Sequence, residues 1–266
     1  MNYKLGFIGV GNMGGALLRA ALKTVPADDI AISGRDPIKT HNIAKELDCA
    51  AIDANGLAAS SKYIFLGVKP QSMESVLKGI AGVLSARTDR FILVSMAAGL
   101  SMKTIRNMAG GDYPIIRIMP NTPVSVGEGM ILYDTTDVAP DEETSFLEYM
   151  SGSGKFDRLS ENYIDAGCAL SGCGPAFVYM FIEALADGAV SCGLPRAKAI
   201  EYAAQTCLGA SKLVLNSDKH PGELKDAVCS PGGSTIQGVR ALEENSFRSA
   251  AIEAVIAAYE KTKSLG

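Results

Sequence analysis

Up to about residue 160, short apolar runs rich in β-branched residues alternate with longer stretches whose apolar positions recur at helical spacing. This alternation is typical of a parallel sheet covered by helices. The predicted strands cover residues 5–8, 30–33, 50–52, 63–68, 91–96, 115–119 and 130–133. The predicted helices cover residues 13–23, 37–47, 71–84, 101–108 and 141–150. Asp36 and Pro37 mark the beginning of the second helix, because aspartate caps free N–H groups and proline suits the first helical position.

From about Asn162 the strand pattern gives way to alanine-rich helical spacing. The helices predicted there cover residues 165–171, 175–192, 196–216, 221–228, 235–244 and 247–264. The second of them is apolar almost all round, which predicts burial inside a bundle or at an oligomer interface. We therefore predict an α/β doubly wound sheet over residues 1–161, an all-α helical domain over residues 162–266, and a homodimer.

The composition is that of an ordinary globular protein, with 47% hydrophobic residues, 20% charged residues and a net charge of −4. This mild acidity gives no electrostatic reason to expect nucleic acid or an anionic membrane as a partner. The six cysteines form no CxxC pair and do not cluster with the two histidines, so we expect free buried thiols and no metal site. Glycines interrupt the first apolar run, and no run of about 18 apolar residues follows. We expect a cytoplasmic protein.

Residues 5–18 read LGFIGVGNMGGALL, an apolar strand followed by a glycine-rich turn and a helix. A GxGxxG alone is a weak signal, but between a strand and a helix it predicts a dinucleotide site in a Rossmann-type fold. Gly9 allows the tight turn, Gly11 lets the backbone approach a pyrophosphate, and Gly14 permits close helix packing. The phosphates would then meet free N–H groups at a helix N-terminus. A glycine-rich turn without a ligand is the alternative.

The second predicted strand ends in Ser33, Gly34 and Arg35. An NAD site favours a carboxylate at this place, to hold the ribose hydroxyls. A hydroxyl and a guanidinium instead suit a 2′-phosphate, which a carboxylate would repel. We therefore predict NADP(H), with NAD(H) less favoured. The alternative is that Arg35 is only a solvated surface charge.

Three further strand ends should line the same crevice, because parallel strands present their carboxyl ends at one edge of a sheet. Their residues are Val68-Lys69-Pro70-Gln71, Ala97-Ala98-Gly99 and Pro120-Asn121-Thr122-Pro123. The small residues of the second end leave room for a nicotinamide ring against the backbone. Ordinary loops punctuated by proline and glycine explain the same residues equally well.

The helical half contains a second glycine-rich turn, CSPGGSTIQGVRALEE over residues 229–244. Gly232 and Gly233 precede a helical pattern, so several N–H donors would lie at the positive end of a helix dipole. Ser230, Ser234 and Thr235 add hydroxyl groups. We predict a site for a small carboxylate; a helix start capped by serine or threonine is the alternative.

Two other sets of polar residues favour structural roles. Glu183 and Asp187 lie four residues apart on one helix face and could form an acid–base pair. Hydrogen-bonded structural carboxylates or subunit contacts explain them better in so apolar a helix. His220 precedes Pro221 at a helix start, where capping is the default role.

Segments spread over the whole chain resemble the pyrroline-5-carboxylate reductase family. They are LGFIGVGNMGGALL, FLGVKPQ, SMAAGLS, RIMPNTP, LSGCGPAFVYMFIEALADGAVSCGLPR and KHPGELKDAVCSPGGSTIQGVRALEENSFRSAAIEAV. The SGCGPAF and SPGGSTI segments are far more specific than the glycine loop. The resemblance implies a Rossmann domain followed by a helical dimerisation domain, with dimers gathered into decamers. It implies NADPH-dependent reduction of the C=N bond of 1-pyrroline-5-carboxylate to L-proline, the last step of proline biosynthesis.

The resemblance also implies residue roles. The pyrophosphate would be bound by Gly9, Gly11, Asn12, Met13 and Gly14. The adenosine phosphate would be bound by Ser33, Arg35 and Asn55. The nicotinamide and its ribose would be surrounded by Val68, Lys69, Pro70, Ala97, Ala98 and Asn121. The substrate carboxylate would be bound by backbone N–H groups of the loop that contains Ser230, Gly232, Gly233, Ser234 and Thr235. The Thr235 hydroxyl would hydrogen-bond the substrate nitrogen. Gly14, Cys173 and Ser234 depart from the residues frequent in the family without removing a required donor.

A cyclic imine takes a proton on nitrogen far more readily than a carbonyl does on oxygen, so its reduction needs no strong protein acid. This suits a loop without histidine or lysine, and we expect catalysis by positioning, with Thr235 helping to orient and protonate the nitrogen. Two alternatives are weighed against this interpretation. A β-hydroxyacid dehydrogenase needs a lysine on a helix of the second domain, and residues 175–192 contain none. A non-catalytic NADPH-binding sensor has no use for a second carboxylate loop.

Overall fold

The computed structural model describes residues 2–264, which divide into two compact units. The first consists of residues 2–173 together with 258–264, and the second is Gly174–Ala257. The domain boundary expected between residues 161 and 162 stays a prediction, since the more compact division falls after Cys173.

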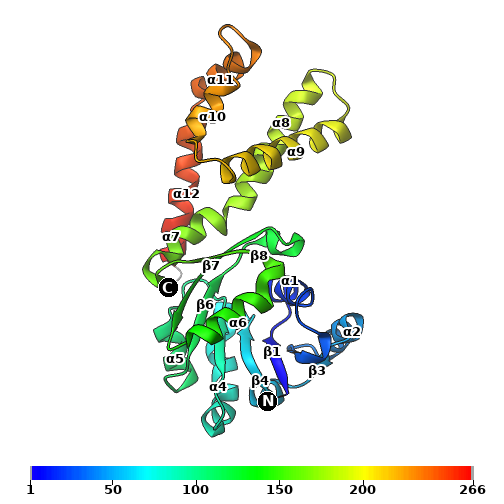
Figure 1. Ribbon diagram of the computed structural model, residues 1–266, viewed down its shortest axis with the longest axis vertical. Coiled ribbons are helices and arrows are strands. Elements are labelled where there is room, and N and C mark those ends of the chain that lie inside the picture. Colours follow the sequence, from blue (N-terminus) through cyan, green and yellow to red (C-terminus); the bar gives the residue numbers. More distant parts are fainter. Residues whose placement is uncertain (1, 265–266) are drawn as a thin grey trace. The chain divides into compact units, whose positions relative to one another are not determined.

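The first unit is built on an eight-stranded sheet with the order β3-β2-β1-β4-β5-β6-β7-β8 (Figure 1). The strands are β1 (Tyr3–Ile8), β2 (Ile30–Ser33), β3 (Ala50–Ala51), β4 (Ser61–Leu66), β5 (Ile92–Ser95), β6 (Ile115–Met119), β7 (Gly129–Thr136) and β8 (Gly154–Arg158). Neighbouring strands are parallel except for β6 and β7. The strand order runs outward in both directions from β1 and β4. A doubly wound sheet opens its binding crevice at such a switch point, beside the carboxyl ends of the strands.

Helices cover both faces of this sheet. They are α1 (Asn12–Ala21), α2 (Pro37–Leu47), α3 (Ala54–Ser60), α4 (Pro70–Ala86), α5 (Met102–Ala109), α6 (Pro140–Met150) and α7 (Glu161–Ser171), with short 3-10 helices η1 (Ala27–Asp29), η2 (Thr122–Val126) and η3 (Ser151–Ser153). Asp36 caps α2 as predicted, since its Oδ1 accepts from the backbone N–H groups of Ile38 at 3.0 Å and Lys39 at 3.1 Å.

Two separate cores follow from the alternation of side chains along each strand. Leu5 and Phe7 of β1 join Phe65 of β4 in the core beneath α1 and α6, where the two phenyl rings stack with centroids 4.3 Å apart. Ile8 and Ile64, one position along each strand, join the core beneath α3, α4 and α5. Both faces of the central strands are therefore buried, which explains their continuous apolar sequence.

A buried arginine fixes α7 on the sheet. Arg117 of β6 is 3% exposed and donates to Glu161 at 3.1 Å and to Asp165 at 3.0 Å, both on α7. Glu161 also accepts from the N–H of Met102 at the beginning of α5, at 2.7 Å. The guanidinium thus connects β6 with α7 through paired charges, the condition under which a charged group is tolerated in a core, and Glu161 extends the connection to α5.

Every strand and helix predicted for this unit is present, but one α-helix and one strand were missed, besides the short 3-10 helices. The segment of α3 reads ANGLAAS, and its Asn-Gly pair indicates a turn rather than a helix of seven residues. The segment of β8 reads GKFDR and is half-buried or exposed throughout, so an edge strand here carries no apolar alternation. The helix predicted to begin at residue 165 begins at Glu161, whose N–H donates to Asp134 at 2.7 Å.

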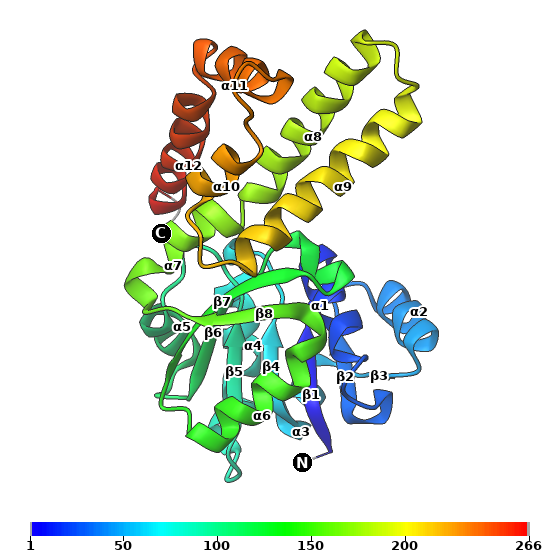
Figure 2. The same ribbon diagram turned by 45° about the horizontal axis from the view of Figure 1, so that its top comes forward.

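The second unit is entirely helical, as predicted. It contains α8 (Gly174–Ser191), α9 (Arg196–Leu215), α10 (Pro221–Ala227), α11 (Ser234–Glu244) and most of α12 (Phe247–Lys263). α8 and α9 pack side by side (Figure 2) around a small core in which Ala186, Ala199 and Ala203 are buried.

The apolar helix α8 is not buried by its own chain. Only Ala186 is buried along it, whereas Val178, Tyr179 and Met180 are 47%, 60% and 70% exposed. Of the two placements predicted for this helix, the interior of a bundle is therefore wrong and an oligomer interface remains. The stretch Glu161–Ser191 is also long and apolar enough to cross a membrane, a property that core helices of soluble proteins share. Apolar surface of this extent needs a cover.

Candidate active site

The glycine loop between β1 and α1 is tightly packed against the protein at two of its three glycines. Gly9 has φ +98°, and a Cβ there would lie 2.6 Å from the carbonyl oxygen of Gly67. A Cβ on Gly14 would collide with the carbonyl oxygen of Gly9. At Gly11 an added Cβ would meet no atom within 4 Å. The fold itself does not require Gly11, so the open space beside it suits the close approach of a ligand.

The loop also leaves hydrogen-bond donors free. Gly11 is the N-cap of α1, and no side chain caps the helix or places an acid in its first turn. The first N–H groups of α1 therefore lie unpaired at the positive end of the helix dipole, an arrangement that binds phosphate. Asn12 and Met13 are the first residues of that turn. The residues predicted to hold the pyrophosphate are thus together, and their geometry fits the group.

The ends of β1 and β2 are joined by a hydrogen bond of 2.7 Å from Gly9 N–H to the Ser33 carbonyl. Beyond them lies a hollow of about 680 Å³ lined by Ser33, Gly34, Pro37, Ile38, Thr40, His41, Asn42 and residues 51–54. Asn55 follows this lining directly on α3. The structure therefore places Ser33 in the wall of this hollow and Asn55 next to it.

Both carboxylates near this hollow cap helices. Asp36 caps α2, and Asp53 caps α3 through the N–H of Gly56 at 2.7 Å. Arg35 is exposed and has no ion-pair partner within residues 2–264. A hydroxyl and a guanidinium without an ion-pair partner suit a 2′-phosphate.

The ends of β4 and β5 lie beside the glycine loop. The N–H of Gly67 donates to the Ile8 carbonyl at 2.8 Å, which holds the end of β4 against the end of β1. Val68 follows, Lys69 is the N-cap of α4, and Pro70 is its first residue. After β5, Ala97 is buried and Ala98 packs against the apolar cluster beneath α7. Ala98 is partly exposed, and the role of these residues at a nicotinamide stays a prediction.

The side chain of Asn121 has a structural role. It is 8% exposed, its Nδ2 donates to the Ser171 carbonyl at 2.9 Å, and its Oδ1 accepts from Met130 N–H at 3.0 Å. The side-chain amide therefore connects the end of β6 with β7 and with the end of α7. Any contact of this residue with a nicotinamide is left to its backbone.

The second glycine-rich segment forms a tight turn before α11. The N–H of Gly233 donates to the Ser230 carbonyl at 3.0 Å, with Pro231 and Gly232 at the centre of the turn. Gly232 has φ +70°, the conformation that position requires in a type II turn. Gly233 is the N-cap of α11 without a side-chain cap, and the first turn holds no acid. Free N–H groups beginning at Ser234 and Thr235 are thus available to a carboxylate.

Two of the polar residues expected to be structural, His220 and Asp187, have structural partners, whereas Glu183 is exposed and its role stays a prediction. His220 caps α10, with its Nδ1 accepting from Gly222 N–H at 3.0 Å. Asp187 pairs with Arg196 at 2.5 Å. Cys168 lies on the buried face of α7, and burial raises the pKa of its thiol to about 11, so it is no nucleophile at neutral pH.

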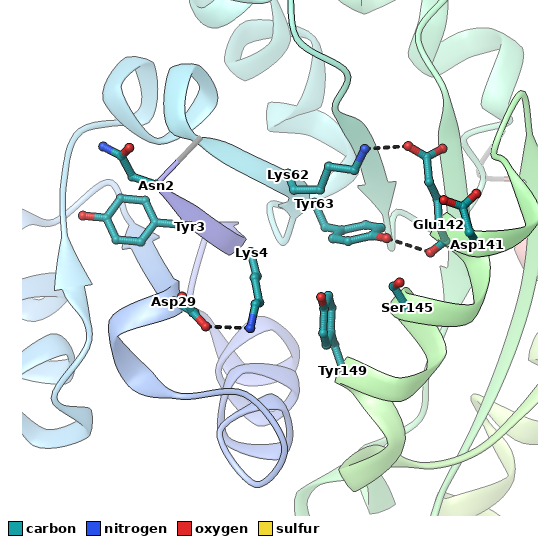
Figure 3. A pocket seen from close by; sticks show the side chains of 10 residues that line it. All are labelled: Asn2, Tyr3, Lys4, Asp29, Lys62, Tyr63, Asp141, Glu142, Ser145 and Tyr149. Atoms are coloured by element: carbon teal, nitrogen blue, oxygen red, sulfur yellow. Dashed lines mark hydrogen bonds and ion pairs between the residues drawn. The ribbon is translucent and has the colours of Figure 1, made fainter.

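A polar hollow of about 450 Å³ lies at the opposite, amino-terminal end of the strands (Figure 3). Four of its charged groups form two ion pairs: Lys4 contacts Asp29 at 2.8 Å, and Lys62 contacts Glu142 at 2.5 Å. Tyr63 donates to the Glu142 carbonyl at 2.7 Å. Burial alone would raise the pKa of Glu142, but hydrogen bonds from Arg90 and Lys62 outweigh it and lower that pKa to about 2. We interpret this hollow as a structural connection between β1, β4 and α6.

One residue beside the glycine loop was missed in the sequence. Lys39, in the first turn of α2, lines a third hollow together with Gly11 and Asn12. The available signal was a cation in the first turn of a helix, where the helix dipole disfavours positive charge.

Comparison with known proteins agrees with this geometry. Residues 161–265 match the model of the pyrroline-5-carboxylate reductase dimerisation family, and residues 4–99 match that of the coenzyme F420-dependent NADP oxidoreductase family. A pyrroline-5-carboxylate reductase of Escherichia coli K12 is 40% identical over 269 residues, covering 100% of this chain and 99% of the relative. The soybean (Glycine max) protein of that name is 38% identical over 268 residues, covering 99% and 96%.

Solved structures resemble the chain along its whole length. The crystal structure of Plasmodium falciparum pyrroline carboxylate reductase with NADP bound has a TM-score of 0.88 and 34% identity, covering 100% of this chain and 98% of the other. A pyrroline-5-carboxylate reductase of Coxiella burnetii has a TM-score of 0.90 and 28% identity, covering 100% and 99%. An archaeal ketol-acid reductoisomerase, at 13% identity and a TM-score of 0.62, shares the fold alone.

Proposed function

The chain belongs to the pyrroline-5-carboxylate reductase family, and from that premise we propose its reaction. It reduces the C=N bond of 1-pyrroline-5-carboxylate with NADPH and releases L-proline, the last step of proline biosynthesis. The observation that carries this proposal is the pair of glycine turns in one chain. Each opens onto a helix N-terminus without an acid in its first turn, one suited to a pyrophosphate and one to a small carboxylate.

The cofactor is assigned to the first unit. The loop of Gly9, Gly11, Asn12, Met13 and Gly14 would bind the pyrophosphate through N–H groups of α1. Ser33, Arg35 and Asn55 would bind the adenosine phosphate. Val68, Lys69, Pro70, Ala97, Ala98 and the backbone of Asn121 would surround the nicotinamide and its ribose. The open space at Gly11 and the capping roles of Asp36 and Asp53 support this assignment. NADH would bind the same loop without using the phosphate contacts.

The substrate carboxylate is assigned to the turn before α11. The N–H groups that begin at Ser234 and Thr235, together with the Ser230 hydroxyl, would hold it by charge-assisted hydrogen bonds. Gly232 and Gly233 keep the turn narrow and leave its backbone uncovered. This contact orients the ring, so that the Thr235 hydroxyl can reach the ring nitrogen.

The residues of this chain contribute to the reaction mainly by positioning the substrate. Bound NADPH supplies the hydride that reduces the imine carbon. The imine nitrogen carries a proton before reduction, so the chain needs no strong acid there. Thr235 would hold the N–H in line and stabilise the charge on nitrogen, while the carboxylate anchor keeps the ring in one orientation.

The assembly follows from the helical unit. We propose that a second copy of the chain covers α8 in a homodimer and that five dimers form a decamer. On this proposal the apolar stretch Glu161–Ser191 faces protein and not lipid, and the enzyme works in the cytoplasm without nucleic acid or membrane as a partner.

Thr235 offers the sharpest test of the proposed mechanism. A hydrogen bond to a charged group is worth about 1.5–3 kcal/mol, so Thr235→Val should lower kcat by about ten- to hundredfold. Thr235→Ser keeps the hydroxyl and should keep most of the turnover. Steady-state kinetics with NADPH and 1-pyrroline-5-carboxylate measures both variants. Full turnover by Thr235→Val would remove the residue from the mechanism, whereas NADPH binding without turnover in the wild type would favour a sensor.

A further inference from the structure

Asn55 and Gly56 form the single Asn-Gly pair of the chain, and they lie in the first turn of α3. Asparagine is a thermolabile residue. Its amide is lost most readily when glycine follows, because a residue without Cβ leaves the next backbone nitrogen unhindered. Asn55 is exposed, and no hydrogen bond within residues 2–264 engages its side-chain amide. The carbon that this reaction attacks is therefore open to solvent and free to turn.

The reaction takes place between these two residues. The backbone nitrogen of Gly56 loses its proton and forms a bond to the side-chain carbonyl carbon of Asn55, and ammonia leaves after taking a proton from water. Water then opens the cyclic succinimide at either of its carbonyl groups, which gives aspartate or isoaspartate. The net change is the uptake of one water and the release of one ammonia, without an oxidant or a cofactor. Its nucleophile is the nitrogen of Gly56.

A carboxylate holds this nitrogen in place. Oδ1 of Asp53 accepts from the Gly56 N–H at 2.7 Å and thereby caps α3. The hydrogen bond keeps the proton on the nitrogen, and the negative charge beside it disfavours the loss of that proton. The N–H of Leu57 donates to the carbonyl of the same aspartate at 3.0 Å, which fixes the turn. Asp53 therefore restrains the nucleophile, while the side chain of Asn55 stays free.

The other places where this chemistry could occur are less open to it. Asp187 and Gly188 lie inside α8, where the glycine N–H belongs to the hydrogen-bond ladder of the helix. Asn216 and Asn245 precede serine, whose side chain hinders the attack. Asn55 is therefore the residue of the chain that is most open to this modification.

We propose that Asn55 is a site of spontaneous deamidation restrained by the Asp53 cap, and that its conversion weakens the binding of NADPH. The second half rests on the proposed function, which assigns Asn55 to the adenosine phosphate. The new carboxylate would lie beside the hollow that Ser33 lines, where it repels a bound phosphate. Isoaspartate also lengthens the backbone of α3 directly ahead of Leu57, which is buried in the core.

The site is tested by peptide mass spectrometry after incubation of the folded protein in warm neutral buffer. Asp53→Ala removes the cap and should raise the rate of conversion at Asn55 about fivefold, the change that a lost helix cap makes to an opening equilibrium. Asp53→Ser keeps a capping oxygen and should keep most of the protection. Asp36→Ala is the matched control, because it removes the cap of α2 and should leave the rate at Asn55 unchanged.

A variant of the glycine should stop the reaction. The nearest contact of a Cβ on Gly56 would be Asp53 Oδ1 at 3.6 Å, so Gly56→Ala fits the fold and hinders the attack. Conversion that is no faster in Asp53→Ala than in the wild type, or that persists in Gly56→Ala, would overturn the proposed site.

The consequence for the cofactor is measured by fluorescence titration, which does not depend on turnover. Asn55→Asp reproduces one product and should weaken NADPH binding about tenfold through charge repulsion. Asn55→Ser removes the amide without adding a charge and should lose less. An unchanged affinity in Asn55→Asp would overturn the second half of the proposal. A wild-type protein that binds NADPH but does not reduce the imine would refute the proposed reaction and leave the modification site intact.

Discussion

The two units of this protein bury their apolar residues in opposite ways. In the first unit, Phe7, Phe65 and Phe146 are completely buried within the unit's own core. In the second, the side chains of Tyr179 and Met180 are 60% and 70% exposed, and the buried cluster consists of three alanines. The first unit therefore contains its own folding core, whereas the second has too little buried surface to be stable without a cover. The apolar composition of α8 encodes an interface rather than a core.

Breaking the interface should have the largest effect. The variant carrying both Tyr179→Glu and Met180→Glu places two carboxylates on the exposed face of α8, where a partner subunit could bury them only at high cost. We expect the solution mass to fall to that of one chain and activity to be lost, while the first unit still binds NADPH. Light scattering after gel filtration measures the mass.

The control for this variant is Ile38→Glu, which changes an apolar residue that is 76% exposed on α2 of the first unit. It should leave the solution mass unchanged. A wild-type protein that is already a single chain, or a double variant that keeps the wild-type mass, would contradict the contrast between the two units.

The next largest effect concerns the arginine that fixes α7 inside the first unit. Arg117→Ala leaves the partly exposed carboxylates of Glu161 and Asp165 without their guanidinium, and the loss of a hydrogen bond to a charged group costs about 1.5–3 kcal/mol. Chemical denaturation should show a loss of that size. Arg87, whose side chain pairs with the more exposed Asp89, is a poorer site for such a test. A loss below about 1 kcal/mol would show that the buried network contributes little.

A smaller effect, dependent on pH, follows from Glu142. Its pKa in the folded protein is about 2 against an ordinary value of 4.5. A carboxyl whose pKa is lowered by folding stabilises the protein above its unfolded pKa, and that stabilisation disappears as the pH falls from about 4.5 towards 2. Glu142→Gln should lower stability at neutral pH and flatten the acid side of the stability curve. Equal acid sensitivity in variant and wild type would contradict this.

The smallest effect on stability separates two glycines of one loop. Gly11→Ala should leave the melting temperature nearly unchanged, because its Cβ would meet nothing within 4 Å, yet it should weaken NADPH binding by filling that space. Gly9→Ala should lower the melting temperature instead, because Gly9 has a positive φ and its Cβ would meet the Gly67 carbonyl. Similar melting temperatures for both variants would show that the loop is less tightly packed than the structure indicates.

The sequence predicted the first unit well because its signals are local. The strand over residues 30–33 and the helix over residues 37–47 were predicted with the ends that the structure has. β8 and α3 were not predicted, because an exposed edge strand and a seven-residue helix with an Asn-Gly pair carry no periodic apolar signal.

The candidate site was harder to predict in detail. The glycine turns could be read directly, because turn chemistry restricts residue type. The side-chain task of Asn121 could not, since its partners, Ser171 and Met130, come from other elements. Lys39 escaped for the same reason: only the fold brings the first turn of α2 beside Gly11.

The central claim is that the two glycine turns serve one hydride transfer to an imine. The most direct measurement supplies NADPH deuterated at its transferring position together with 1-pyrroline-5-carboxylate and follows the product by mass spectrometry. We predict L-proline that carries one deuterium on the former imine carbon, formed at a rate equal to the loss of NADPH. Folded protein that binds the cofactor but yields no labelled proline would contradict the account.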